Sequence, residues 1–285
     1  MKSCARQMPE RKFLFAIVPT LAVLLASPVT ARAWGERAHQ MVNAAAVENL
    51  PEPLRSHFRA RKGFLIEHAS DPDRLAKEEC EERPHHYTEV EAYDQYPFES
   101  FRTEFVDERR GPSPLQLRHG DLLWQIERFA LRLAEALRAR RWDEADQAAV
   151  FAAHYACDLT QPLHTVRNYD GQLTNQVGLH ARFESDLVNV LADRWVLVAR
   201  PAASEPDLRP RIFAEMLESY RSRNLIFASD RIAVAGHNYA DLEYFSTFLS
   251  LAGPVAKKRL EAAVSFVSTL WYTAWVRAGK VALPL

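Results

Sequence analysis

The chain has 285 residues, of which 48% are hydrophobic, and its formal net charge at pH 7 is −1. Proteins that bind nucleic acid mainly through a basic surface have an excess of Lys and Arg, so this composition excludes that class. Three cysteines in a chain of this length also exclude a small fold held together by disulfides.

Residues 1–33 are typical of a secretory signal peptide. Basic residues precede an apolar run from Phe13 to Val29, and Ala31-Arg32-Ala33 fits an A-x-A cleavage site. We therefore expect cleavage between Ala33 and Trp34, and a secreted or periplasmic protein. An uncleaved membrane anchor is the alternative, but two prolines interrupt the run and it is short for a spanning helix.

Cleavage would leave a domain of residues 34–285. It would remove five of the 36 Lys and Arg residues and one of the 37 Asp and Glu residues, which gives a net charge of −5. A polyanionic substrate would then need local positive charge, which bound metal ions can supply. Of the remaining cysteines, Cys80 and Cys157 could form one disulfide in an oxidising compartment. The sequence implies no stable protein partner, so we expect a monomer.

The spacing of the apolar residues predicts an all-α fold in a single compact multi-helix domain. Gly is scarce, and apolar residues recur at helical rather than alternating spacing. Helices are expected at about 36–49, 121–140, 143–161, 177–198, 208–227 and 239–250, and a long C-terminal helix should carry Leu260 to Ala274 and end near Gly279. Loops are expected at 80–118 and 165–176, where Pro, Gly, Asn and charged residues are frequent.

Two pairs of His and carboxylate residues at helical spacing indicate a metal site. His154 and Asp158 lie four residues apart on a predicted helix, so both side chains can reach one ion. The proline that follows should end that helix and leave His164 just beyond it. His180 and Glu184 repeat the spacing. One such pair can also be a surface ion pair or a buried His satisfied by one Asp, but two pairs joined by a third His favour a metal.

Two further segments could complete such a site. Asp71-Pro-Asp73 offers a carboxylate and His85-His86 an imidazole, each in a predicted loop. At the predicted mature N-terminus, the α-amino group and carbonyl oxygen of Trp34 can chelate one ion, and His39 lies about one helical turn further on. The alternatives are that Asp-Pro-Asp is only a turn sequence and that Trp34 only packs against the core.

Taken in order, these motifs resemble the three-zinc superfamily that joins secreted single-strand nucleases of the S-one and P-one type with bacterial zinc-dependent phospholipases C. The shared motifs are Trp34-Gly-x-x-x-His39, Pro72-Asp73-Arg74, His86-Tyr87, His154-x-x-x-Asp158-x-x-x-x-x-His164 and His180-x-x-x-Glu184. The resemblance implies a fold of the phospholipase C and nuclease P-one type and three bound Zn²⁺ ions.

The resemblance also assigns the ligands by position. One zinc would be held by Asp73, His86, His154 and Asp158. A second would be held by His164, His180 and Glu184. The third would be held by the amino nitrogen and carbonyl oxygen of Trp34, by His39 and by Asp158 as a bridge. Asp71 is a rival to Asp73, and His85 is a weaker rival to His86.

The chemistry that the resemblance implies is hydrolysis of a phosphodiester by metal-activated water, with Asp73 orienting or deprotonating that water. The leading hypothesis is an endonuclease or nucleotidase that acts on single-stranded nucleic acid. In that case Tyr87 is a candidate for stacking on a base, although it can equally be an ordinary packing residue. The Trp34-Gly-x-x-x-His39 opening is similar to the nuclease branch.

The alternative substrate is a phospholipid, because Glu184 and the short interval from His164 to His180 are similar to the phospholipase branch. A phospholipase C would need an apolar rim, and five aromatic residues could form it or belong to the core: Tyr93, Tyr96, Phe98, Phe101 and Phe105. A zinc-storage protein without turnover is a third hypothesis, but its ions would be fully ligated, whereas the assigned ligands leave open positions. Spacing alone also fits manganese or iron.

Overall fold

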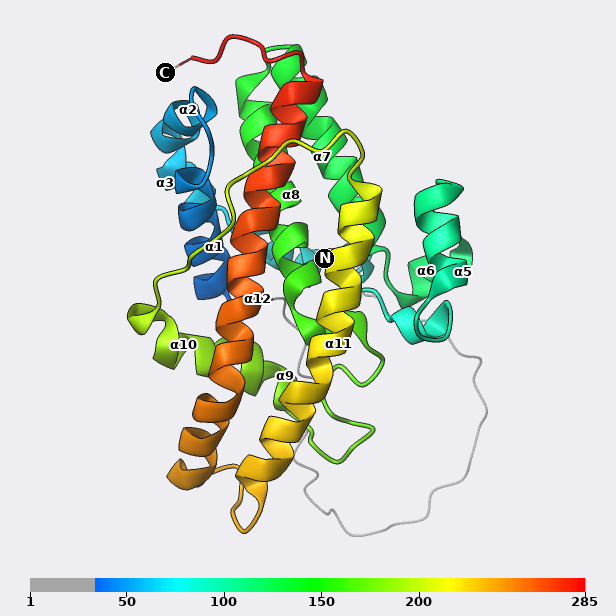
Figure 1. The fold of residues 1–285 in the computed structure, drawn as a ribbon, viewed down its shortest axis with the longest axis vertical. Coiled ribbons are helices and arrows are strands. Elements are labelled where there is room, and N and C mark those ends of the chain that lie inside the picture. Colours follow the sequence, from blue (N-terminus) through cyan, green and yellow to red (C-terminus); the bar gives the residue numbers. More distant parts are fainter. Residues whose placement is uncertain (1–33, 285) are drawn as a thin grey trace, which may run out of the picture. The chain divides into compact units, whose positions relative to one another are not determined.

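Four long helices form the centre of the fold, and all of the described helices belong to one compact unit. These four are α7 (Leu122–Arg138), α8 (Trp142–Thr160), α11 (Arg209–Val234) and α12 (Leu242–Arg277). Figure 1 shows this computed structural model, which describes residues 34–284. No strand occurs within that range, so the all-α prediction is confirmed. The predicted signal peptide lies outside the described residues.

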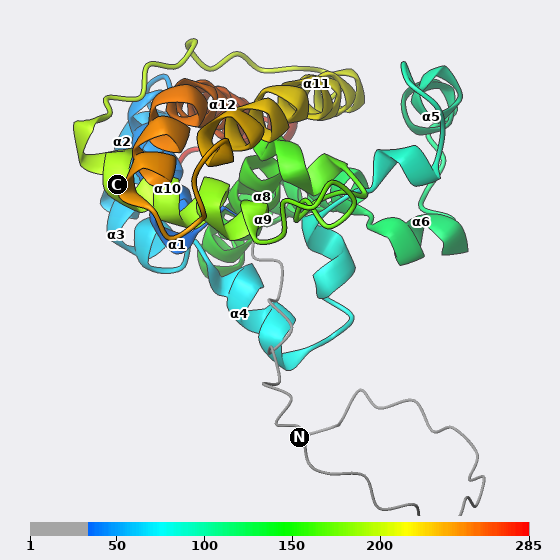
Figure 2. The same cartoon turned by 90° about the horizontal axis from the view of Figure 1, so that it is seen from below.

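Shorter helices pack around this centre. The N-terminal part supplies α1 (Glu36–Glu48), α2 (Leu54–Ala60), α3 (Lys62–Glu67) and α4 (Asp71–Glu78). Helix α8 lies in the middle, with α11 and α12 on one side and α4 on the other (Figure 2). In the part of the chain that the structure describes, no helix is both long and apolar enough to cross a bilayer.

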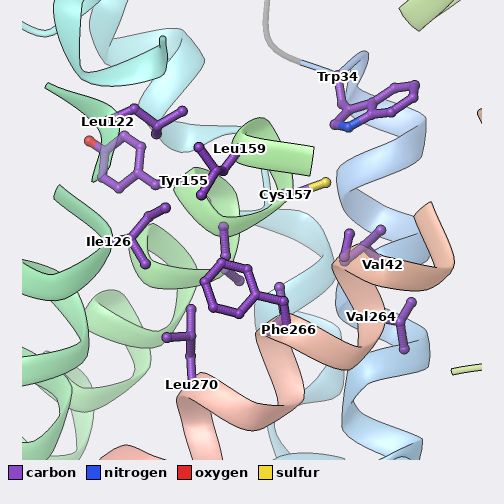
Figure 3. Close-up of a cluster of buried hydrophobic side chains, with 14 of the residues drawn as sticks. Trp34, Val42, Leu122, Ile126, Tyr155, Cys157, Leu159, Val264, Phe266 and Leu270 are labelled. Atoms are coloured by element: carbon purple, nitrogen blue, oxygen red, sulfur yellow. The ribbon is translucent and has the colours of Figure 1, made fainter. Parts of the chain in front are cut away.

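Helix α8 is buried on nearly every face over its second half. Its alanines, among them Ala149, Ala152, Ala153 and Ala156, let the neighbouring helices approach closely. Tyr155 points towards Leu122 and Ile126 of α7, while Cys157 points towards the α1 side (Figure 3). Polar side chains are costly to bury without a partner. The buried His154 and Asp158 of this helix should therefore have polar or ionic partners in the interior.

Cys157 is a free, fully buried thiol in the described structure, so the possible disulfide with Cys80 does not form. Burial raises the pKa of the Cys157 thiol well above its ordinary value, and the nearby Asp158 and Asp73 carboxylates raise it further. The thiol is therefore a packing group of the core at neutral pH.

The predicted helices at 239–250 and from Leu260 onwards are one continuous helix, α12, so the predicted break between them is wrong. Pro254 lies inside this helix. It removes one backbone hydrogen bond, but Phe248, Ala252 and Ala256 on either side of it are buried, and their packing keeps the helix continuous. Helix α11 likewise continues to Val234, past its predicted end.

The predicted loop at 80–118 contains several short helical turns. They are η1 (Arg83–His86), η2 (Val90–Ala92), α5 (Glu99–Arg102), η3 (Thr103–Asp107) and α6 (Pro114–His119). Phe98, Phe101 and Phe105 from this segment are buried, so of the two alternatives left open by the sequence these three belong to the core and not to an apolar rim. Their packing fixes the segment that carries His86.

The stretch from 177 to 198 is helical as far as Arg194, but in four pieces: α9 (Leu179–Ala181), the π-helical turn η5 (Arg182–Asp186), α10 (Leu187–Leu191) and η6 (Ala192–Arg194). The expected loop before it is confirmed, because no helix lies between η4 (Pro162–Thr165) and α9 in the described structure. The π turn contains Glu184, and such turns often occur at functional sites.

Candidate metal centre

Three groups of His and carboxylate side chains converge in the interior. In each group the potential ligand atoms lie within 4.8 Å of one another. The groups are His39, His154 and Asp158; Asp73, His86 and His154; and His164, His180 and Glu184. All eight side chains that the sequence proposed as ligands therefore belong to a group, and His154 belongs to two.

Asp158 connects the first two groups through its two carboxylate oxygens. Its Oδ1 lies 3.4 Å from Nε2 of His39. Its Oδ2 lies 3.1 Å from Nδ1 of His86 and 3.3 Å from Nε2 of His154. Asp158 is fully buried on α8, one turn after His154, so the helix itself sets this geometry. A carboxylate arranged in this way can bridge two cations.

Asp73 completes the second group. Its Oδ1 lies 3.7 Å from both Nδ1 of His86 and Nε2 of His154. The residue was expected in a loop but lies in the first turn of α4, because Pro72 favours the start of a helix. Its rival Asp71 instead pairs with His68 and Arg74, at 2.6 Å in each case, and belongs to none of the three groups.

The rival histidine, His85, also faces another partner. Its Nδ1 lies 2.6 Å from Oδ1 of Asp121, and the side chain belongs to none of the three groups. His86, the next residue along the 3₁₀ turn η1, is buried and faces Asp158. The two adjacent imidazoles of this turn therefore point in different directions: His85 contacts Asp121, and His86 contacts the cluster.

The third group lies around η4 and the π turn. Nε2 of His180 lies 2.9 Å from Oε2 of Glu184, and Nε2 of His164 lies 3.2 Å from Nε2 of His180. Gln161, at the end of α8, lies 3.3 Å from the same Glu184 oxygen. The sequence analysis did not include Gln161, although it lies within the motif between Asp158 and His164.

Main-chain carbonyls fix the orientation of three of these imidazoles. Nδ1 of His154, His164 and His180 lies 2.9, 2.7 and 3.0 Å from the carbonyl oxygens of Ala69, His86 and Tyr169, respectively. A carbonyl oxygen can only accept, so each Nδ1 carries the proton and each Nε2 presents its lone pair to the cluster. This arrangement is usual for histidines that bind metals.

Several buried atoms of the cluster have no hydrogen-bond partner within the described part of the chain. They are both ring nitrogens of His39, Nε2 of His86 and Oδ1 of Asp158. A buried polar atom without a partner costs about 1–3 kcal/mol, and native structures rarely leave several together. A cation between His39 and Asp158 would satisfy Nε2 of His39 and Oδ1 of Asp158, which lie 3.4 Å apart, and the mixture of imidazole and carboxylate donors suits a transition metal. The residues therefore fit a metal centre.

The electrostatics of the cluster agree with this interpretation. Burial, followed by the nearby His154, lowers the pKa of His39, so His39 stays neutral. Burial also acts to lower the pKa of His154, but Asp158 and Asp73 outweigh it and raise that pKa to about 9. Burial opposes ionisation of Asp158, yet His154, His39 and His86 hold its pKa well below the ordinary value. Without a metal, His154 would therefore be protonated at neutral pH, and a cation that binds the cluster would replace this proton.

The side chain of Trp34 packs in the core. Its indole Nε1 donates to Oγ1 of Thr160 at 3.3 Å, and its ring lies 5.4 Å from that of Phe183. This packing anchors the residue between the end of α8 and the π turn, so its main chain lies where α1 begins. The predicted role of its amino and carbonyl groups as ligands stays a prediction.

Tyr87, predicted as a stacking platform, is half-buried and packs against Gly120, which has a φ of 91°. A Cβ at Gly120 would lie 2.1 Å from the carbonyl oxygen of Tyr87, so only glycine fits. Asp73, in contrast, lines a cavity of about 840 Å³ together with Ser70, Arg74 and Lys77. Among the described residues that line it there is no aromatic side chain.

The sequence of the chain matches no family model, and comparison with curated proteins finds no match. The superfamily resemblance therefore remains an expectation based on the order of the motifs.

Proposed function

We propose that the chain is a secreted, zinc-dependent phosphodiester hydrolase, most simply an endonuclease or nucleotidase that acts on single-stranded nucleic acid. The observation that carries the proposal is that Asp158 contacts both of the first two ligand groups, while the His86 carbonyl accepts a hydrogen bond from His164 of the third. Three neighbouring groups linked in this way support a cluster of ions rather than isolated structural sites.

The donor set supports zinc. Imidazole nitrogen and carboxylate oxygen are common zinc ligands, and no group contains a soft thiolate. When bound, zinc ions supply a Lewis acid that makes water nucleophilic near neutral pH and offsets the charge on phosphoryl oxygens. We assign the three groups to three ions, and the resemblance adds the main chain of Trp34 to the ion of the group that contains His39.

Asp73 differs from the other ligands in its exposure. Its side chain is 17% exposed, whereas those of His154 and Asp158 are fully buried. It lies between the buried cluster and the cavity that it lines, so a water approaching from the cavity meets its carboxylate. We therefore assign Asp73 the role of orienting the attacking water and accepting its proton, in addition to its role as a ligand.

The charge around the same cavity supports an anionic substrate. Arg37, Arg74 and Lys77 line it. The two arginines are paired with acidic residues, but Lys77 has no ion pair within residues 34–284. Glu36 also lines the cavity and pairs with Arg74, so Lys77 supplies the unpaired positive charge beside the metal ligands.

The test is an assay of the protein that starts at Trp34, with single-stranded DNA, single-stranded RNA and phosphatidylcholine vesicles as separate substrates. We expect release of nucleotides, loss of activity with a chelator and recovery with added zinc. Release of diacylglycerol with no release of nucleotides would replace the nuclease by a phospholipase C. Stoichiometric zinc with no turnover of any substrate would indicate a binding protein and overturn the proposal.

A further inference from the structure

The π turn η5 carries one side chain that points away from the third group. His180 and Glu184 lie four residues apart and face each other, with Nε2 of His180 2.9 Å from Oε2 of Glu184. Arg182 is two residues from each, so its side chain leaves the opposite side of the helical turn. Its main-chain carbonyl accepts the hydrogen bond from the amide of Leu187 that closes the π turn. A contact that fixes Arg182 therefore also fixes the turn that contains Glu184.

The guanidinium of Arg182 is held by three oxygens. Its Nη1 donates to the carbonyl of Val177 at 2.8 Å, and its Nη2 lies 3.2 Å from the carbonyl oxygen of Gln176 and 3.1 Å from Oδ1 of Asp230 on α11. Its Cζ also lies 4.0 Å from the centroid of the Tyr239 ring, in the segment between α11 and α12. Arg182 thus connects the π turn to the preceding loop and to α11.

Asp230 is the fully buried acceptor at the centre of this network. Besides Arg182, its carboxylate accepts hydrogen bonds from the phenols of Tyr244 and Tyr239, at 2.7 and 3.2 Å, and from the side-chain amide of Gln176 at 2.8 Å. Buried ion pairs are tolerated only when further hydrogen bonds satisfy both partners, as they do here. With partners from three segments of the chain, the carboxylate has a single position.

The backbone that leads to His180 is shaped around the same guanidinium. Gly178 has a φ of 85°, and a Cβ at this position would lie 2.8 Å from Nη1 of Arg182. The same loop orients His180, whose Nδ1 lies 3.0 Å from the carbonyl oxygen of Tyr169. Both ligands of the π turn region therefore depend on segments that meet at Arg182.

We propose that Asp230 is a positioning residue of the metal centre: by fixing Arg182, it holds the π turn in the register that places Glu184 beside His180. The inference rests on the proposed function in taking the third group as a metal site, whereas the hold on the turn needs no metal. Asp230 itself belongs to none of the three groups. Isolated π turns are rare, and the contacts of Arg182 and Asp230 supply the support that this one needs.

The first experiment measures hydrogen exchange of the Leu187 amide in the metal-free protein by NMR. Asp230→Asn keeps the shape of the side chain but removes its charge. We expect exchange at Leu187 to become more than about tenfold faster, because losing a charged hydrogen-bond partner favours local opening of the turn.

The matched control is Glu127→Gln. It makes the same chemical change in the pair of Glu127 and Arg209, which lie 2.7 Å apart at the other end of α11. It should leave exchange at Leu187 unchanged, although it also removes the charge of an arginine's partner. Unchanged exchange in Asp230→Asn, or equal acceleration in both variants, would overturn the inference.

The second experiment uses competition with a chelator to measure the affinity for the zinc ion that His180→Ala loses. We expect a loss of about 10–100-fold in Asp230→Asn, the range typical of changes around metal ligands, and none in Glu127→Gln. In an Arg182→Met background, Asp230→Asn should cause no further loss, because Asp230 acts through Arg182. If Asp230→Asn does not fold, Tyr239→Leu should shift both readouts in the same direction, since it removes the exposed ring against Arg182 and one donor to Asp230.

The outcomes separate this inference from the proposed function. Wild-type affinity for this ion in the variants, or an additive loss in the double variant, would overturn the inference and leave the proposed function intact. Failure of the wild type to bind zinc through His180 would overturn the assignment of three ions and the metal part of this inference. The exchange result would then still decide whether Asp230 holds the turn.

Discussion

The Nε2 atoms of His164 and His180 lie 3.2 Å apart, and each ring has its Nδ1 directed at a main-chain carbonyl. In their neutral forms both Nε2 atoms carry lone pairs, so at this distance they repel each other unless a cation or a proton lies between them. A metal ion bound by both Nε2 atoms would remove this repulsion.

Removal of metal should lower the stability of the protein. At a free zinc concentration 100 times the dissociation constant, one site contributes about 2.7 kcal/mol, which corresponds to roughly 5–10 °C in the melting temperature of a domain of this size. Calorimetry with and without chelator measures the effect. In His180→Ala the chelator should have a smaller effect. An identical melting temperature in both conditions would contradict a metal in the third group.

Two aspartates two residues apart allow a matched test of the catalytic assignment. Asp73→Asn should reduce kcat on the order of 100-fold or more, because it removes both a proton acceptor and a ligand. Asp71→Asn makes the same chemical change at a side chain that pairs with His68 and Arg74 on the surface, where ion pairs contribute about 0–1 kcal/mol. Its activity should stay within a few-fold of the wild type. The reverse result would show that Asp71 is the ligand.

Helix geometry explains which parts of this site the sequence could predict. The His154–Asp158 pair lies on one helix, and its spacing alone fixes a common face, so its proximity follows from local structure. Asp73 and His86 lie in short helical turns that begin at prolines, and turns of this length contain too few apolar residues to show a period. Their meeting with α8 depends on tertiary packing.

Glu82 and His86 form a further His–carboxylate pair that the sequence analysis did not identify. Glu82 precedes His86 by four residues, the same spacing as the other His–carboxylate pairs, but it lies in the stretch 80–118, which the composition predicts to be a loop. The structure has a 3₁₀ turn with a proline at its start, which brings the two side chains together. The continuity of α12 through Pro254 was missed for a related reason, since packing outweighed a local helix breaker.

Burial of His57 should make stability depend on pH. Its Nδ1 donates to the carbonyl of Pro284 at 2.6 Å, and burial lowers its pKa below the ordinary value, with a smaller contribution from Arg61. The unfolded chain therefore binds a proton near its pKa of about 6.5 that the folded chain does not. The stability that neutral His57 provides is complete above this pH and is lost as the pH falls below it.

Urea denaturation of the wild type and of His57→Gln between pH 7.5 and 5.5 tests this prediction. The amide of Gln can still donate to Pro284, and changes in metal binding affect both proteins equally. The difference in unfolding free energy between the two should shrink as the pH falls, by at most about 1.4 kcal/mol per pH unit. A difference that stays constant or grows towards pH 5.5 would contradict a lowered pKa.

Signal-peptide removal should complete the metal centre. If the amino group of Trp34 binds the same ion as His39, a protein that begins at Trp34 has a ligand that its precursor lacks, because an amide nitrogen inside a chain is a poor metal ligand at neutral pH. Adding one alanine before Trp34 should lower both the zinc content, from three ions to two, and the activity. The buried indole, held by Thr160, should keep the fold unchanged in circular dichroism.

His39→Ala removes a side-chain ligand from the ion that Trp34 is expected to bind, since Nε2 of His39 lies 3.4 Å from Oδ1 of Asp158. We expect it to lose the same single zinc ion, as measured by elemental analysis, while Asp73→Asn should affect a different ion. Equal zinc content and activity in the extended and the mature proteins would limit Trp34 to the packing role that its indole already has. In that case the ion would have side-chain ligands only from the group of His39, His154 and Asp158 in the described part of the chain.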